Sequence, residues 1–124
     1  MECKRAGQDD DGAYAGLQQI ADDPEALVEK LDRVRAEDSS SDLATTIVMA
    51  LRAHGSSEIA MGALEDILRR DESWYLRSTA ATVLSEIGTQ RALELLAVAA
   101  EDEDKRVSDN AGWRLKQRAP TGSR

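Results

Sequence analysis

The chain has 124 residues, of which 41% are hydrophobic and 3% aromatic, with no Phe, a single cysteine and a net charge of −8. One cysteine excludes an intramolecular disulfide, and no apolar run reaches the roughly 18 residues that span a bilayer, so we expect a cytoplasmic protein without membrane association. Residues 1–42 hold 5 basic and 12 acidic side chains, and their net charge of −7 would repel a nucleic acid backbone.

Helical patterns follow one another along almost the whole chain. The first predicted helix, over residues 13–21, is short, and the second has Asp23 as its capping residue and Pro24 in its first turn. Apolar residues three and four positions apart predict the other helices, so that the set covers residues 13–21, 24–36, 43–54, 57–70, 74–87, 90–100 and 105–117. Ser57 and Thr89 are the expected caps of two later helices. We therefore expect one helical domain over 13–117, flanked by disordered tails over 1–12, which is acidic, and 118–124.

A repeat of 31 to 33 residues relates these helices to one another. The motif LSEIG at Leu84–Gly88 recurs as LRAHG at Leu51–Gly55 and, more weakly, as LQQIA at Leu17–Ala21. The glycine that closes the first two motifs predicts a left-handed helix end. Each second helix of a pair is followed by an acidic residue that we expect to cap the next helix, and these residues are Asp38, Asp71 and Asp102.

A pair of such short helices cannot bury its apolar face alone, whereas stacked pairs can. The predicted fold is therefore all-α, a short right-handed α-solenoid of about three antiparallel helix pairs with a closing C-terminal helix. Its core should contain the leucines at the centre of each repeat, which are Leu51, Leu64, Leu84 and Leu96.

One copy of the repeat carries the pattern of a known family. The pattern is Asp, an apolar residue followed by Arg, an Ala-rich run, Leu, Gly, Ala-Leu and a closing Asp, and it falls on Asp71, Leu76-Arg77, Ala80-Ala81, Leu84, Gly88, Ala92-Leu93 and Asp102. This copy resembles a HEAT-like repeat of the phycobilisome-lyase type. The neighbouring copies have Ala44 and Ser108 where the Arg belongs. The resemblance implies an Asp–Arg ladder between repeats, in which Arg77 bonds to Asp38 or Asp102.

We find no pattern in the sequence that is typical of a catalytic or metal site. His54, the only histidine, precedes Gly55 at a predicted helix end, where a capping role is expected. Cys3 lies far from it, in the predicted tail. Neither of the acidic runs Asp9–Asp11 and Glu101–Asp104 has the full pattern of a calcium loop, which is carboxylates at alternating positions, a glycine at the sixth and a glutamate at the twelfth. We therefore expect no metal, no cofactor and no enzymatic activity.

The few aromatic residues are candidates for a partner-binding surface. On a helical wheel, Trp74 and Tyr75 lie outside the apolar stripe of residues 76–87, and Trp113 lies off the equivalent stripe of the last helix. Because exposed Trp and Tyr are enriched at binding hot spots, we predict that these residues contact a partner, with Arg77 as a polar anchor. The alternative is structural, with Trp74 folded over the loop between repeats and Trp113 covering the last helix.

A second candidate surface lies on the second helix of each pair, because these helices usually line the concave side of such a solenoid. Their outward acidic positions are Glu65, Asp66, Glu94 and Glu101. The segment Leu95–Ala100 is apolar on every face, which indicates packing between neighbouring helices or self-association.

These features favour a non-catalytic protein–protein interaction module, an adaptor or scaffold. The acidic first third favours a basic protein partner, although a role in solubility alone also explains its charge. One alternative is a small acidic antidote or immunity protein that covers a basic toxin or enzyme. The resemblance suggests another alternative, a subunit similar to bilin lyases or associated with a different enzyme.

Overall fold

The computed structural model of the chain describes residues 16–123, and their side chains as far as residue 117. Residues 16–20 are helical, and the elements that follow are α2 (Pro24–Asp38), α3 (Asp42–Ala50), the 3-10 helix η1 (Leu51–His54), α4 (Glu58–Arg70), α5 (Trp74–Ile87), α6 (Gln90–Ala99) and α7 (Lys105–Ser123). No strand occurs within this part of the chain, which confirms the all-α prediction. The predicted tail over 1–12 lies outside the described residues.

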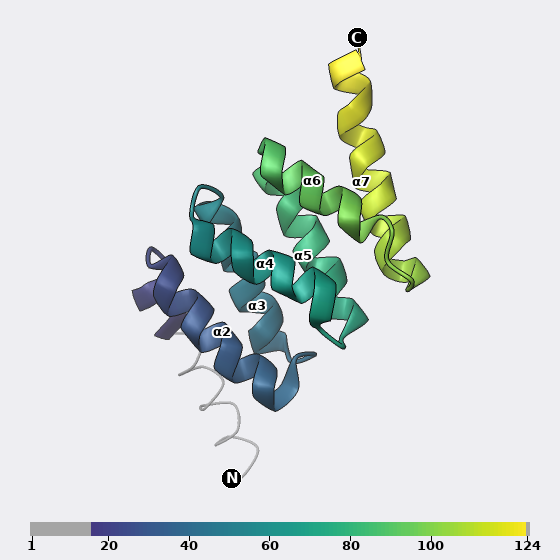
Figure 1. The fold of residues 1–124 in the computed structure, drawn as a ribbon. Helices are drawn as coiled ribbons and strands as arrows, with labels where there is room; N and C mark the ends of the chain where they lie inside the picture. The colour runs from purple at the N-terminus through teal and green to yellow at the C-terminus, as the bar shows by residue number, and fades with distance from the viewer. Residues whose placement is uncertain (1–15, 124) are drawn as a thin grey trace.

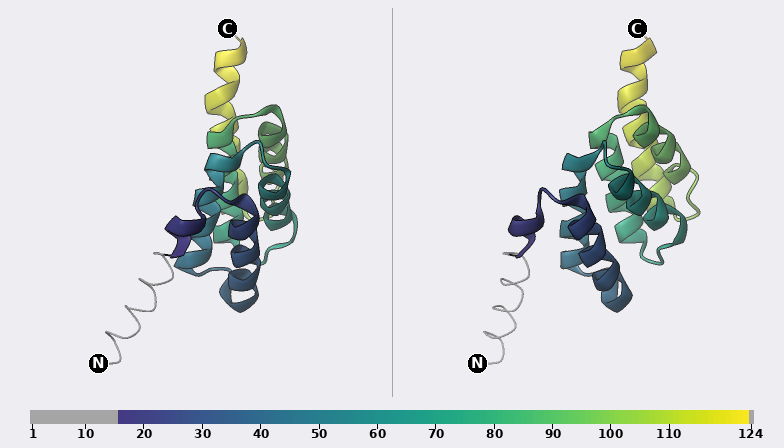
Figure 2. Two further views of the ribbon diagram at one scale, coloured as in Figure 1. Left: turned by 90° about the vertical axis from the view of Figure 1, so that its left-hand side faces the viewer. Right: turned by 60° about the vertical axis from the view of Figure 1, so that its left-hand side comes forward.

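The helices stack in two layers as a short α-solenoid. Helices α2, α4 and α6 form one layer, and α3, α5 and α7 form the other (Figure 1). Figure 2 shows the two layers edge-on, with short loops that lead from one layer to the other. Each helix packs against its neighbours in the chain and against the equivalent helix of the adjacent repeat, as the 31 to 33 residue period predicts.

Most helix boundaries lie within two residues of their predicted positions. Two differ in kind. The predicted helix 43–54 is α-helical only to Ala50, and its last turn tightens into η1, a frequent ending of an α-helix. Helix α7 ends at Ser123 instead of residue 117; Gln117, Arg118 and Ala119 favour helix, whereas local propensity does not explain its course through Pro120 and Gly122. The helix thus continues through residues that we expected to form a disordered tail.

The three predicted caps are confirmed. The side chains of Asp23, Ser57 and Thr89 each accept a hydrogen bond from the backbone N–H three residues later, at 3.1 to 3.2 Å. The prediction that Asp38, Asp71 and Asp102 cap the next helix is wrong, because residues closer to each helix start take that role; for α7 it is Asp104, whose Oδ1 accepts from the Arg106 N–H at 2.9 Å. Ser41 caps α3 and Ser73 caps α5.

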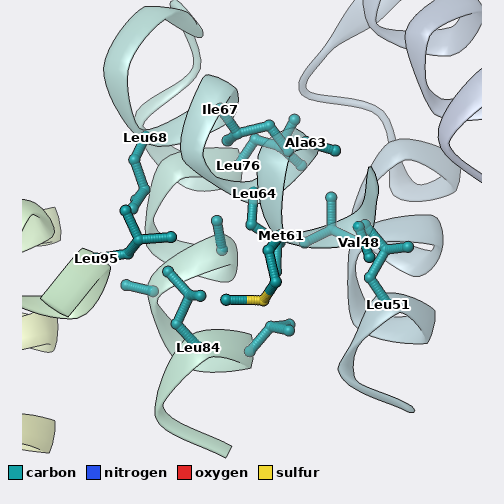
Figure 3. Packing of buried hydrophobic residues seen from close by; sticks show 14 of the residues in the cluster. Val48, Leu51, Met61, Ala63, Leu64, Ile67, Leu68, Leu76, Leu84 and Leu95 are labelled. Carbon is teal, nitrogen blue, oxygen red and sulfur yellow. The ribbon is translucent and has the colours of Figure 1, made fainter. Parts of the chain in front are cut away.

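The core consists of aliphatic side chains between the two layers. All four predicted central leucines have an exposed fraction of 0%, and they are Leu51, Leu64, Leu84 and Leu96. Figure 3 shows Leu64 and Met61 of α4 extending toward the side chains of α3 and α5. On α5, Leu76, Ala80, Val83 and Leu84 are buried as the wheel predicts, and Ile87 packs at the margin of the core. In the described residues, every buried side-chain nitrogen or oxygen has a hydrogen-bond partner.

The two repeat glycines have different structural roles. Gly88 adopts the predicted left-handed conformation, with φ 70°, and its N–H donates to the Leu84 carbonyl at 3.0 Å. The same prediction is wrong for Gly55, which has φ −64° because the chain leaves η1 with right-handed geometry. Gly55 instead lies against the next repeat, where a Cβ atom would be only 2.6 Å from Cγ2 of Ile87. Close packing between repeats therefore explains this glycine.

We expect three glycine-to-alanine variants to separate these causes. Gly55→Ala should lower the free energy of unfolding by about 1–3 kcal/mol through overlap with Ile87. Gly88→Ala should lower it by about 1–2 kcal/mol because of the left-handed backbone. Gly62→Ala is the matched control: nothing lies within 4 Å of its added Cβ in α4, so it should stabilise by about 0.5–1 kcal/mol. Urea unfolding measures all three, and stabilisation by Gly55→Ala would contradict the proposed contact.

Among the residues that the structure describes, we find no helix with the length and hydropathy of a membrane span.

Candidate protein-binding site

Three loops lie in a row along one edge of the solenoid, and we call them the loop edge. They connect α2 to α3, α4 to α5 and α6 to α7, and they comprise residues 39–41, 71–73 and 100–104. In Figure 1 they follow one another along the lower right side of the molecule, with the loop after α2 lowest. Stacking of equivalent helix pairs brings equivalent loops to one edge, as in other solenoids.

An aspartate organises each loop of the loop edge. The side-chain Oδ1 of Asp38, Asp71 and Asp102 accepts a hydrogen bond from the backbone N–H two residues later, at 3.0, 2.8 and 2.8 Å. This is the side-chain turn that Asp commonly forms before a helix. The regular spacing of these residues, 33 and 31 positions, therefore specifies three turns of the same kind.

Two of these aspartates are held by arginines across the repeats. Arg77 Nε donates to Asp102 Oδ2 at 2.9 Å, as one of the two predicted pairings requires, and its Nη1 donates to the Asp71 carbonyl at 2.7 Å. Asp71 binds Arg35, whose Nε is 2.8 Å from Oδ2. In the repeat that has Ala44 in the Arg position, Arg35 at the end of α2 thus provides the guanidinium that pairs with the loop aspartate. A ladder of two Arg–Asp pairs fixes the loop edge.

The ladder corrects the predicted role of Arg77. Its side chain is only 14% exposed, against 10% for Asp102, and its donors point at the protein itself. These hydrogen bonds engage the guanidinium within the protein, so Arg77 positions the loops and has little surface left for a partner.

The aromatic pair lies at the centre of the loop edge, where α5 begins. The Trp74 and Tyr75 rings meet edge to face, with centroids 5.5 Å apart. Tyr75 is 48% exposed, which agrees with its predicted position outside the core. Trp74 is half-buried against the core and carries Arg106 of α7 over its ring, 3.8 Å from the centroid. Trp74 therefore connects two repeats, as in the structural alternative given for this residue in the sequence analysis. Tyr75 is the more accessible member of the pair.

Arg106 is fixed over Trp74 by Asp104. The Arg106 side chain donates two hydrogen bonds to the Asp104 carboxylate, at 3.1 and 2.9 Å. These bonds lower the pKa of Asp104 from its usual value and raise the pKa of Arg106. Both groups consequently stay charged around neutral pH, so the face of Trp74 is already occupied by a cation of the same chain.

Two open grooves lie on either side of the central loop. The first, of about 860 Å³, runs between the end of α2 with its following loop and the segment from the end of α4 to Tyr75. The second, of about 620 Å³, runs between that segment and residues 101–103. Trp74 and Tyr75 line the first groove, which is the larger of the two.

The grooves have an excess of negative charge. Their arginines all form ion pairs within the protein, and they are Arg35, Arg69, Arg70 and Arg77. Six carboxylates along the grooves form no ion pair with another residue of the described part of the chain, and they are Asp32, Glu37, Asp38, Glu72, Glu101 and Glu103. The surface around Tyr75 therefore has an electrostatic preference for cations.

The four acidic residues predicted on the second helices do not form one patch. Glu65 pairs with Arg69 and Arg91, at 2.9 and 3.5 Å, so it is largely neutralised. Asp66 is likewise held by two arginines of the first groove. Glu94 is exposed on α6 and accepts from Gln90 at 3.2 Å. Only Glu101 belongs to the unpaired carboxylates of the loop edge.

Other singled-out residues lie away from this edge. Trp113 is 58% exposed on α7, as its wheel position predicts. The Nε2 of His54 is 2.6 Å from the Ala21 carbonyl, so the ring ties η1 to the turn before α2 instead of capping its own helix. Within residues 16–123 we find no cluster of His, Cys, Asp and Glu side chains that could hold a metal ion. Cys3 and Asp9–Asp11 lie outside the described residues.

Sequence reasoning missed two residues that shape the loop edge, Arg35 and Arg106. Arg35 lies 36 positions before Asp71, outside the family pattern, and the only signal was the missing arginine at Ala44. For Arg106, the acidic neighbour Asp104 and the aromatic Trp74 were both visible, but only the stacking of α7 on α5 brings them together.

Comparison with known proteins agrees with this architecture. Residues 61–122, half of the chain, match the family model of HEAT repeats. The matched segment begins within α4 and includes α5, α6 and most of α7. It concerns HEAT repeats in general and does not distinguish the phycobilisome-lyase type. No curated protein and no solved structure matches the chain.

Proposed function

This chain belongs to the HEAT repeat family, and from that premise we propose that it is a non-catalytic module that binds a basic protein partner at the loop edge. HEAT repeats typically mediate protein–protein interactions. The observation that carries the proposal is the first groove, which is lined by the half-exposed ring of Tyr75 and by carboxylates that form no ion pair with another described residue, among them Asp38 and Glu72.

The chemistry of the groove suggests how a partner is recognised. A lysine or arginine of the partner would approach Asp32, Asp38 and Glu72 without competition from the arginines of the groove, which are already paired. Its alkyl stem or guanidinium would rest against Tyr75, because Trp74 already carries Arg106. Tyr75 is thus the expected hot spot, with the carboxylates providing specificity and steering.

We also propose that the chain acts in the cytoplasm and has no catalytic activity of its own. Three of the described side chains that were considered for chemistry have structural partners: His54 contacts a backbone carbonyl, and Asp102 and Asp104 bind arginines.

The unpaired carboxylates also favour a narrower form of the same function. In this form the chain is an antidote or immunity protein, and its basic partner is a toxin or enzyme that loses activity when covered. Affinity capture from the host followed by mass spectrometry would name the partner, and an activity assay of that partner with and without the chain would separate an antidote from an adaptor. A bilin lyase subunit is a further alternative, for which visible absorption of protein purified from its host is the expected sign.

We expect Tyr75→Ala to weaken binding of the captured partner at least tenfold, which corresponds to about 1.4 kcal/mol. Its melting temperature should stay near that of the unsubstituted protein, because half of the ring is exposed. Ile59→Ala is the matched control: Ile59 is 43% exposed but lies in the first turn of α4, at the opposite end from the loop edge, and should leave affinity unchanged. Isothermal titration calorimetry measures both variants. Unchanged affinity in Tyr75→Ala would overturn the proposed site.

A further inference from the structure

The outer face of α7 corresponds, one repeat later, to the face of α5 that packs against α7. Ser78, Thr82 and Ser85 of α5 receive α7: Asn110 donates to Ser78 and Thr82 at 3.0 and 3.2 Å, and Arg114 donates to Ser85 at 3.2 Å. The residues 31 positions later on α7 are Asp109, Trp113 and Lys116. All three are exposed, and within residues 16–123 no helix packs on them.

Two further pairs of residues at equivalent positions of α5 and α7 show that part of α7 is uncovered. Leu84 of α5 is 0% exposed, whereas its equivalent Leu115 of α7 is only partly buried. Ala81 is 0% exposed, whereas a Cβ built on its equivalent Gly112 would meet nothing within 4 Å. Helix α7 is thus the first helix of a pair whose second helix is absent from the described residues. Its open face combines Gly112, Leu115 and the 58% exposed Trp113.

Gly112 gives this face the shape for close contact with another helix. A glycine inside a helix destabilises it by about 1 kcal/mol relative to alanine, and here no contact within the described residues requires it. Without a Cβ, the backbone of a second helix can cross near Gly112 at short distance, and the neighbouring Trp113 would cover its side.

The charges on the face are complementary to themselves in an antiparallel crossing. Asp109 lies three residues before Gly112 and Lys116 lies four residues after it. If two such helices cross in opposite directions at Gly112, each Asp109 comes next to Lys116 of the other copy. The present partner of Asp109 is Lys105, in an exposed pair with side chains 64% and 85% accessible, which contributes little and can rearrange. The acidic helix α2 lies at the other end of the solenoid, so its charge does not oppose this contact (Figure 1).

From these observations we propose that α7 docks antiparallel against α7 of a second copy and forms a two-fold symmetric dimer centred on Gly112. The second copy supplies a helix against the face of α7 that the described residues leave open, and the isologous contact closes without leaving an equivalent face for a third copy. This surface is separate from the loop edge, so each dimer carries two loop edges.

Charge-exchange variants test the dimer. Sedimentation equilibrium of the full chain over a range of concentrations should show a monomer–dimer equilibrium, and Trp113→Ala should raise the dimer dissociation constant at least tenfold. Asp109→Lys should do the same, because two lysines then meet across each contact, and Lys116→Asp should do so because two aspartates meet. A thermal melt of each variant verifies that it is folded.

An equimolar mixture of Asp109→Lys and Lys116→Asp is the decisive sample. In a mixed dimer, the lysine introduced in one copy faces the aspartate introduced in the other, and the second contact keeps its original Asp109 and Lys116. Both contacts are then attractive, so the dimer should return to at least the strength of the unsubstituted protein. No effect within a single chain can produce this rescue. A protein that stays monomeric up to about millimolar concentration, or a mixture that stays as weak as its components, would overturn the proposal.

Discussion

Replacing Arg35 by methionine is expected to lower the free energy of unfolding by about 3–5 kcal/mol. Methionine has a similar length, so packing of the stem is largely kept, while the guanidinium is lost. The Asp71 carboxylate, only 3% exposed, would retain the hydrogen bond from the Ser73 N–H but lose the guanidinium that pairs with it, since Arg77 donates to the Asp71 backbone carbonyl and to the Asp102 carboxylate. An ionised group that is buried and loses its partner retains its full desolvation cost, which explains the large effect.

Two further variants separate this cause from a simple loss of contacts. In the double variant Arg35→Met with Asp71→Asn, no buried charge remains at this position, so much of the lost stability should return. Arg52→Met is the matched control, because Arg52 also pairs with the next repeat, at 2.9 Å from Glu86, but with side chains 56% and 38% exposed. It should cost less than about 1 kcal/mol. Urea unfolding followed by circular dichroism measures all three, and equal losses for Arg35 and Arg52 would contradict a buried ladder.

Leu84→Ala is expected to destabilise the protein by about 2–5 kcal/mol. Leu84 lies at the centre of α5 with an exposed fraction of 0%, and it packs between the two layers beside Met61 and Leu64 of α4 (Figure 3). Truncation removes its transfer free energy and leaves a cavity, because helices held on both sides by neighbouring repeats can close the gap only in part.

Leu115→Ala is the natural comparison for this variant. Leu115 occupies the same repeat position on α7 but is only partly buried, since no second helix of its pair covers it within the described residues. Its truncation should therefore cost clearly less than that of Leu84, by thermal or urea unfolding. The comparison is made at a protein concentration where the monomer dominates, because a second copy on the open face of α7 would also cover Leu115. Equal losses for the two leucines in the monomer would contradict that open face.

The ladder and the core together explain why the loop edge can serve as a binding surface. Tyr75 and the unpaired carboxylates lie on or beside loops, which ordinarily lose entropy on binding. Here Arg35 and Arg77 tie the loops to two neighbouring repeats, and Arg106 holds Trp74 in place. The surface proposed for binding is therefore held in place by contacts within the protein, and the arginines that hold it are already paired with carboxylates.

The sequence by itself determined the local structure of this protein. The caps Asp23, Ser57 and Thr89, the bounds of α5 and the buried leucine positions follow from hydrogen-bonding and periodicity rules that act over three or four residues. The repeat period then implies stacked pairs, because equivalent apolar faces need equivalent neighbours. The exposure of Tyr75 was also readable from the wheel, since it depends on the direction of one side chain relative to a local stripe.

Only the tertiary structure decided which distant groups meet. The family pattern paired Arg77 with one of two loop aspartates, yet Asp71 binds Arg35, which that pattern does not include. The sequence around Gly55 predicted a left-handed helix end, but the structure shows a right-handed conformation there, and the glycine is explained by close contact with Ile87 of the next repeat. Trp74 lies outside the local stripe and is nevertheless half-buried, because α7 brings Arg106 over its ring. In each case the deciding distance joins residues about 30 positions apart, and it depends on how one helix pair is placed on the next, which local periodicity does not specify.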